Sequence, residues 1–106
     1  MQPEAQIVDR LVQMIIDVVH PLKVILFGSA ARADFGPESD IDILVVMPPG
    51  THRRKTAQLL YRQLVGLKVP FDILVATTDD LERHRHNPGL IYQTILREGV
   101  EVYARA

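Results

Sequence analysis

The chain of 106 residues is long enough for one compact domain with its own hydrophobic core. Its composition, 47% hydrophobic and 24% charged, excludes a disordered protein and a coiled coil, and its net charge of −1 gives no electrostatic basis for direct nucleic-acid binding. The absence of cysteine excludes disulfides and thiolate metal sites, and no apolar run approaches the roughly 20 residues that span a bilayer. We therefore expect a single cytoplasmic domain over residues 1–106 with no membrane partner.

The first predicted element is a helix over residues 4–19, which Pro21 ends because proline is excluded from helix interiors. One apolar stripe with helical spacing consists of Ile7, Leu11, Met14, Ile15 and Val18. A second stripe beside it consists of Val12, Ile16 and Val19. We favour core packing for both stripes, and the alternative is that part of this wide apolar surface binds a partner protein.

Two strands follow, separated by a turn region. Residues 23–28 (KVILFG) form a short apolar run ending at glycine, which is typical of a buried strand. Ser29 is placed to cap a helix that begins over residues 29–33, and residues 35–37 (FGP) indicate a turn. Residues 40–46 (DIDILVV) then predict the second strand, which ends before two prolines.

A second amphipathic helix is predicted over residues 53–66. Its apolar side chains face inward, and its outward side chains include the basic residues Arg53, Arg54, Lys55 and Arg62. A solvated helix face is the default interpretation of this basic run, and a phosphate or partner site is the alternative.

The rest of the chain predicts two strands and two short helices. A third apolar strand covers residues 69–76, and Thr78 or Asp79 caps a short helix after it. A helix over 89–98 and a last strand over 100–103 complete the pattern. Strands that alternate with helices predict the α/β class, here a small mixed sheet flanked by helices.

Asp40 and Asp42 interrupt an otherwise apolar strand. Side chains alternate between the two faces of a strand, so both carboxylates lie on one face, about 7 Å apart along the strand, while Ile41 and Ile43 point into the core. Two like charges on an apolar sheet repel, and burial raises their pKa values further. A divalent cation resolves this conflict, and oxygen ligands favour Mg²⁺ or Mn²⁺.

Asp72 interrupts the third apolar strand in the same manner. If that strand neighbours the second one, Asp40, Asp42 and Asp72 converge on one patch. Three carboxylates can hold two metal ions about 3.5–4 Å apart, the arrangement used for in-line nucleotidyl transfer. The structural alternative, acids at strand ends that meet solvent or lysine, explains one aspartate more easily than three, so we predict a metal site.

Gly28 and Ser29 stand where the first strand gives way to the following helix. Glycine permits close approach of the backbone to a ligand, and a helix N-terminus offers free N–H groups to an anion. A Gly-Ser pair at a strand–helix junction is common in proteins and by itself indicates no function. Here Gly28 and Ser29 suggest a ligand site because they stand about ten residues before Asp40.

The segment VILFGSAARADFGPESDIDILVV resembles the signature of the minimal nucleotidyltransferases (MNT), within the polymerase-β nucleotidyltransferase superfamily. The residues that carry the resemblance are Gly28, Ser29, Arg32, Ser39, Asp40, Asp42 and Asp72. The match extends to the C-terminal LREGVEVY, and Ala33 departs from the glycine of many members. The resemblance implies a polymerase-β-like nucleotidyltransferase fold.

The resemblance also implies an enzyme whose substrate is a nucleoside triphosphate, expected to be ATP, and whose cofactors are two Mg²⁺ ions, with Mn²⁺ as a possible substitute. Gly28 and Ser29 would hold the triphosphate, and Asp40 and Asp42 would ligate the Mg²⁺ that bridges it. Asp72 would complete the second metal site and help to deprotonate the acceptor hydroxyl.

Two further residues are weaker nucleotide-binding candidates. Arg32 would contact a phosphate or the acceptor, and a surface arginine at a helix start is an equal alternative. Ser39 fits a turn residue or a hydrogen-bond donor to an aspartate better than a reacting group.

MNT proteins of this size resemble the antitoxin half of a toxin–antitoxin pair whose toxin is a helical HEPN-domain ribonuclease. The resemblance implies transfer of AMP from ATP to a hydroxyl, expected to be that of a tyrosine, on this partner. Two alternatives stay open: an antitoxin that neutralises by binding alone, and nucleotidyl transfer to a small molecule or an RNA end. A homo-oligomer and a complex with the partner are both compatible with the sequence.

Overall fold

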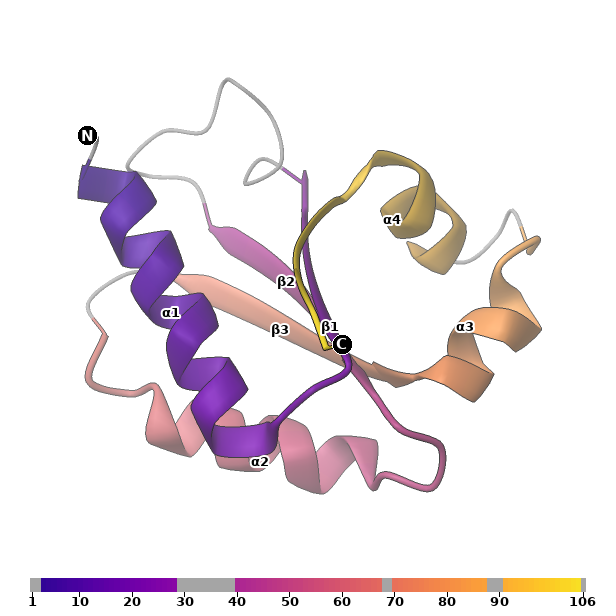
Figure 1. Ribbon diagram of the computed structural model, residues 1–106, viewed down its shortest axis with the longest axis horizontal. Coiled ribbons are helices and arrows are strands. Elements are labelled where there is room, and N and C mark those ends of the chain that lie inside the picture. The colour runs from indigo at the N-terminus through magenta and orange to yellow at the C-terminus, as the bar shows by residue number, and fades with distance from the viewer. Residues whose placement is uncertain (1–2, 29–39, 68–69, 88–90, 106) are drawn as a thin grey trace.

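Four strands form one mixed sheet in the order β3-β2-β1-β4 (Figure 1). The strands are β1 (Lys23–Phe27), β2 (Ile41–Met47), β3 (Phe71–Thr77) and β4 (Val100–Ala104). β1 is antiparallel to β2 and to β4, whereas β2 and β3 are parallel. The structure is a computed structural model that describes residues 3–28, 40–67, 70–87 and 91–105. It confirms the predicted α/β class with a small mixed sheet.

The helices lie in two pairs on either side of the sheet (Figure 1). They are α1 (Pro3–Val19), α2 (Arg53–Gln63), α3 (Thr78–His84) and α4 (Ile91–Glu98). None of the helices in the described ranges is both long enough and apolar enough to cross a membrane. The predicted helix start at 29–33, the Ser29 cap and the turn at 35–37 lie outside the described residues.

The larger core lies between the sheet and α1 and α2, and we call this side of the sheet the closed face. Its buried residues are Leu11, Val12, Ile15, Val24, Leu26, Ile41, Ile43, Val45, Met47, Leu60, Leu64, Ile73 and Val75. Ile16 and Val19 of the second α1 stripe pack partly against this core, and Val12 is buried in it. Both apolar stripes of α1 therefore pack in the core, which confirms the interpretation favoured from the sequence.

A smaller core lies on the other side of the sheet, next to α3 and α4, and we call this side the open face. Its buried residues are Ile25, Leu44, Val46, Ala76 and Ile95, and it is extended by the partly buried Phe27, Leu74, Leu81 and Tyr92. Because strand side chains alternate, every second residue of β2 and β3 belongs to this face. Asp42 and Asp72 are among them.

The predicted cap of α3 was wrong by one or two residues. Thr77, rather than Thr78 or Asp79, is the N-cap, because its extended backbone ends β3 and its side chain accepts a hydrogen bond from the N–H of Asp80 at 3.2 Å. The Asp80 carboxylate accepts the Thr77 N–H at 2.9 Å in return, which completes a capping box. Arg53 lies 3.3 Å from the same carboxylate, so part of the basic run of α2 links α2 to α3.

Candidate active site

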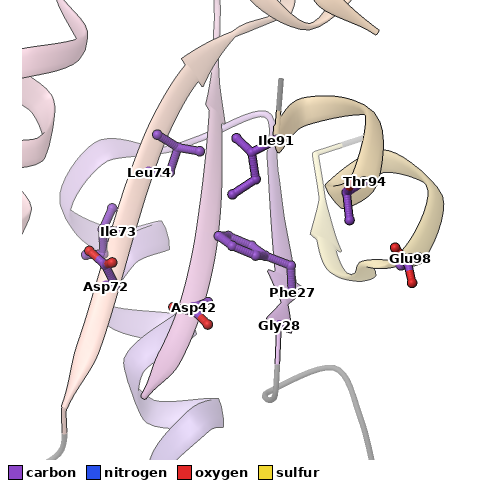
Figure 2. Close-up of a pocket in the computed structure, with 9 residues that line it drawn as sticks. All are labelled: Phe27, Gly28, Asp42, Asp72, Ile73, Leu74, Ile91, Thr94 and Glu98. Carbon is purple, nitrogen blue, oxygen red and sulfur yellow. The ribbon is translucent and has the colours of Figure 1, made fainter. Parts of the chain in front are cut away.

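Asp42 and Asp72 lie side by side on the open face. The parallel pairing of β2 and β3 places Asp42 opposite Asp72, with Ile43 opposite Ile73 one residue further on. Asp42 is half-buried and Asp72 is exposed. The carboxylates therefore come from adjacent strands, as Figure 2 shows, and the predicted neighbourhood of the second and third strands is confirmed.

Asp40 lies at the end of the same strand as Asp42. It is exposed and comes just before the first residue of β2, whereas Ile41 and Ile43 are buried at 2% and 0% exposure, as the alternation predicted. Within the described ranges, no three His, Asp or Glu side chains are grouped closely enough to hold a metal ion. Asp40 is near enough for its charge to raise the pKa of Asp42, and its place in a shared metal site stays a prediction. The close pair is Asp42 and Asp72.

The electrostatics of Asp42 show the conflict that its sequence position implied. Burial raises the pKa of its carboxyl, and the negative charges of Asp72 and Asp40 raise this pKa further. An ionised Asp42 is therefore held against like charge in a partly desolvated place. A divalent cation between the carboxylates would relieve both effects, and oxygen ligands of this kind suit Mg²⁺ or Mn²⁺.

Gly28 borders the pair from the end of β1. Its φ of +62° belongs to the left-handed region, and a Cβ built on it would lie 2.4 Å from Oδ2 of Asp42. Any other residue would push against the carboxylate. The structure therefore shows a close approach of Gly28 to the Asp42 side chain, and the approach to a ligand stays a prediction.

A cavity of about 620 Å³ opens beside the two carboxylates (Figure 2). It is lined by Phe27, Gly28, Asp42, Asp72, Ile73, Leu74, Ile91, Thr94 and Glu98. The acids come from β2 and β3, and Ile91, Thr94 and Glu98 come from α4. Cavities of this size, mostly apolar with a few convergent polar groups, are typical of small-molecule sites.

Tyr61 contacts the site, and sequence reasoning missed it. Its hydroxyl donates to Oδ1 of Asp72 at 3.0 Å and accepts the Ile73 N–H at 2.9 Å. Its ring stacks on Phe71, with centroids 5.5 Å apart and planes 17° apart. Tyr61 belongs to α2, on the other side of the sheet from the cavity, so no motif or spacing in the sequence links it to Asp72.

Three of the predicted site residues, Ser29, Arg32 and Ser39, lie outside the described residues. Their nucleotide-binding roles stay predictions. The structure places Gly28, Asp42 and Asp72 around one cavity and Asp40 at its strand end. Their catalytic and metal-binding roles also stay predictions.

Comparison with known proteins identifies the family. A model of the nucleotidyltransferase domain family matches residues 5–102, so the chain belongs to this family. The fold is similar to that of a candidate nucleotidyltransferase from Sulfolobus solfataricus, whose crystal structure was determined at 1.40 Å. That match has a TM-score of 0.64 and 21% identity, and covers 94% of this chain and 79% of that one. No curated protein matches significantly. The expected nucleotidyltransferase fold is thereby confirmed.

Proposed function

We propose that this protein transfers AMP from ATP to a tyrosine hydroxyl of a HEPN-domain ribonuclease and so acts as its antitoxin. The observation that carries the transfer chemistry is the pair Asp42 and Asp72, held in register on two strands beside Gly28 and a cavity. Membership of the nucleotidyltransferase family supports the reaction class. The partner is inferred from the resemblance of the Gly28–Asp42 segment to MNT antitoxins.

The donor set around the cavity fits a divalent cation. Asp42 and Asp72 would hold it, Asp40 would add a third carboxylate at the end of β2, and Gly28 keeps the Asp42 oxygen free of any side chain. The bound Mg²⁺ would neutralise the triphosphate and the pyrophosphate that leaves. Nucleotidyltransferase domains generally rely on such a cation, which agrees with the charge conflict at Asp42.

We assign the acceptor step to the carboxylate of Asp72. In the transfer, the tyrosine oxygen forms a bond to the α-phosphorus of ATP, the bond to pyrophosphate breaks, and pyrophosphate carries the electron pair away. The phenolic proton moves to Asp72, which lies exposed at the side of the cavity. Asp42 is half-buried and therefore less accessible than Asp72 to an incoming protein.

The surroundings of the acids suit a protein acceptor. Phe27, Leu74 and Ile91 line the cavity with apolar surface against which an aromatic ring can pack. Ile91 of this lining is an exposed aliphatic side chain, with 51% of its surface accessible. Exposed aliphatic residues beside a site favour contact with another protein over a small polar acceptor.

The test uses purified protein, Mg²⁺ and ATP labelled at the α-phosphate in a lysate of the source organism. We expect one labelled protein band, which disappears with Asp42→Asn and with Asp72→Asn and persists with the matched variant Asp9→Asn, whose side chain is exposed on α1. Mass spectrometry of the band should find AMP on a tyrosine. Label confined to RNA or to small molecules would overturn the protein acceptor. An unlabelled lysate, with Mg²⁺-dependent ATP binding intact, would favour an antitoxin that acts by binding alone.

A further inference from the structure

We infer that Tyr61 is a positioning residue of this site: its hydroxyl holds the carboxylate of Asp72, the residue opposite Asp42 in the sheet, in one orientation. The inference deepens the proposed function and rests on it. Tyr61 does not itself line the cavity and meets its lining at Asp72 and Ile73, so we expect any effect on the reaction to pass through the one ionised partner, Asp72.

The direction of the hydrogen bond between Tyr61 and Asp72 follows from the Ile73 contact. The Ile73 N–H can only donate, and it donates to the Tyr61 oxygen at 2.9 Å. The single phenolic proton is therefore free to point at Oδ1 of Asp72, 3.0 Å away. One backbone donor thus orients the hydroxyl, and the hydroxyl in turn orients the carboxylate.

The Tyr61 ring is itself held in place. It stacks on Phe71, the residue that precedes Asp72 in β3. On α2, Tyr61 follows the fully buried Leu60 and stands three residues before the fully buried Leu64, so this turn of the helix is fixed to the closed-face core. The hydroxyl is therefore carried by a rigid ring on a fixed backbone.

Asp72 needs such support more than a buried carboxylate would. It is exposed and lies near the start of β3, which is the last strand of the sheet on that side. An exposed carboxylate samples several orientations, and binding a cation would cost the entropy of selecting one. With Oδ1 bonded to Tyr61, this selection is made before the ligand arrives, and Oδ2 is the oxygen left to meet a cation.

A purely structural role is the competing explanation. β3 has one neighbour in the sheet, so its outer N–H groups need other acceptors, and Tyr61 supplies one to Ile73. Such a role would lower stability when the hydroxyl is removed and would leave cation binding unchanged. The two explanations therefore differ in a measurable property.

The test is Mn²⁺ binding, measured by electron paramagnetic resonance in the presence of α,β-methylene-ATP, which needs no knowledge of the acceptor. Tyr61→Phe keeps the ring and removes only the hydroxyl. We expect it to weaken Mn²⁺ binding about tenfold, the usual scale for a group that orients a metal ligand. Tyr103→Phe, a half-buried tyrosine that packs on the closed face, is the matched control and should bind as the wild type does.

The same substitution in an Asp72→Asn background separates the explanations further. If Tyr61 acts through Asp72, Tyr61→Phe causes no further loss in that background. An equal loss in both backgrounds, or wild-type Mn²⁺ affinity in the single Tyr61→Phe variant, would overturn the inference. Should Tyr61→Phe fail to fold by circular dichroism, Phe71→Leu removes the stacked ring and keeps an apolar side chain against the closed-face core. This variant should weaken Mn²⁺ binding by less than Tyr61→Phe would, and unchanged affinity there would also overturn the inference.

The outcomes also distinguish this inference from the proposed function. If Asp72→Asn weakens Mn²⁺ binding and Tyr61→Phe does not, Tyr61 has no positioning role and the site stands. If Asp72→Asn itself binds Mn²⁺ as tightly as the wild type, Asp72 is not a ligand and both proposals fail.

Discussion

The two faces of the sheet are built from the same strands, but one face forms the main hydrophobic core and the other carries the carboxylates of the candidate site. On the closed face, Ile41, Ile43 and Ile73 are buried beneath α1 and α2 in a core made only of hydrophobic side chains. On the open face, the residues between them include Asp42 and Asp72, which border a cavity. Strand alternation thus lets one peptide segment contribute stability on one side and charged groups on the other. Substitutions on the two faces should therefore separate stability from activity.

The largest effect is expected for Asp42→Asn on the open face. The substitution removes one charge from the pair and should lower the rate of the proposed AMP transfer by on the order of 10³-fold, with the fold intact. Rates of label incorporation, compared with circular dichroism of the same sample, check this. Retention of more than a tenth of the wild-type rate would mean that Asp42 does not serve the reaction.

On the closed face, Leu11→Ala should have the opposite profile. Leu11 has no exposed surface, and its truncation leaves a cavity between α1 and the sheet. We expect a loss of about 2–5 kcal/mol in the free energy of unfolding, measured by urea titration. The rate per folded molecule should stay within a factor of about two, because α1 contributes no residue to the cavity beside the carboxylates. A catalytic defect in fully folded Leu11→Ala protein would argue against the separation of the faces.

Gly28→Ala should affect both properties. The positive φ of Gly28 makes any L-residue there strained, at a cost of about 1–2 kcal/mol in unfolding free energy. The added methyl group would also displace the Asp42 carboxylate, so AMP transfer should fall even though both acids remain. Urea titration and rate measurement on one preparation test the two effects together. Unchanged activity would show that the Asp42 orientation is unimportant.

A smaller, purely structural effect is expected for Asp80→Asn. The Thr77 backbone N–H lowers the pKa of Asp80, and the Thr77 hydroxyl and Arg53 lower it further against the opposing effect of burial. A carboxyl with a lowered pKa stabilises the fold above its ordinary value of 3.8, and this contribution is lost as the pH falls through the lowered value. We expect the variant to lose about 1 kcal/mol at neutral pH.

Thermal melting over a pH series tests the Asp80 prediction. The difference from the wild type should shrink as the solution becomes more acidic than the ordinary carboxyl pKa. If the difference in melting temperature between Asp80→Asn and the wild type stays constant with pH, the lost stability comes from altered packing and not from the charge of Asp80.

The elements were predictable from the sequence because their signals are local. The apolar runs at residues 23–28 and 40–46 and the helical stripes of α1 lie within one or two residues of the observed boundaries. The α3 cap was missed because Thr77 is both the last strand residue and the N-cap, and an apolar run does not show at which residue a strand ends and the next helix begins. The pairing of strands that are distant in the sequence has no such local signal.

The site was predictable in part. The spacing of Asp40 and Asp42 placed them on one face, but their relation to Asp72 depended on strand order, which single-sequence periodicity does not contain. The role of Tyr61 could not be predicted from the sequence, because its contact with Asp72 arises only when α2 packs beside the outer edge of β3. Residues that join different elements through packing leave no local pattern.

The central claim, that Asp42 and Asp72 form a cation site, is tested most directly by thermal melting at neutral pH with and without Mn²⁺. Because the pKa of Asp42 is raised in the fold, its contribution to stability is present below the ordinary value of 3.8 and is lost as the pH rises through the raised value. Without cation, Asp42→Asn should therefore melt a few degrees above the wild type. Saturating Mn²⁺ should raise the wild type past the variant, which itself should barely respond. Equal Mn²⁺ shifts in both proteins, or none in the wild type, would contradict the account.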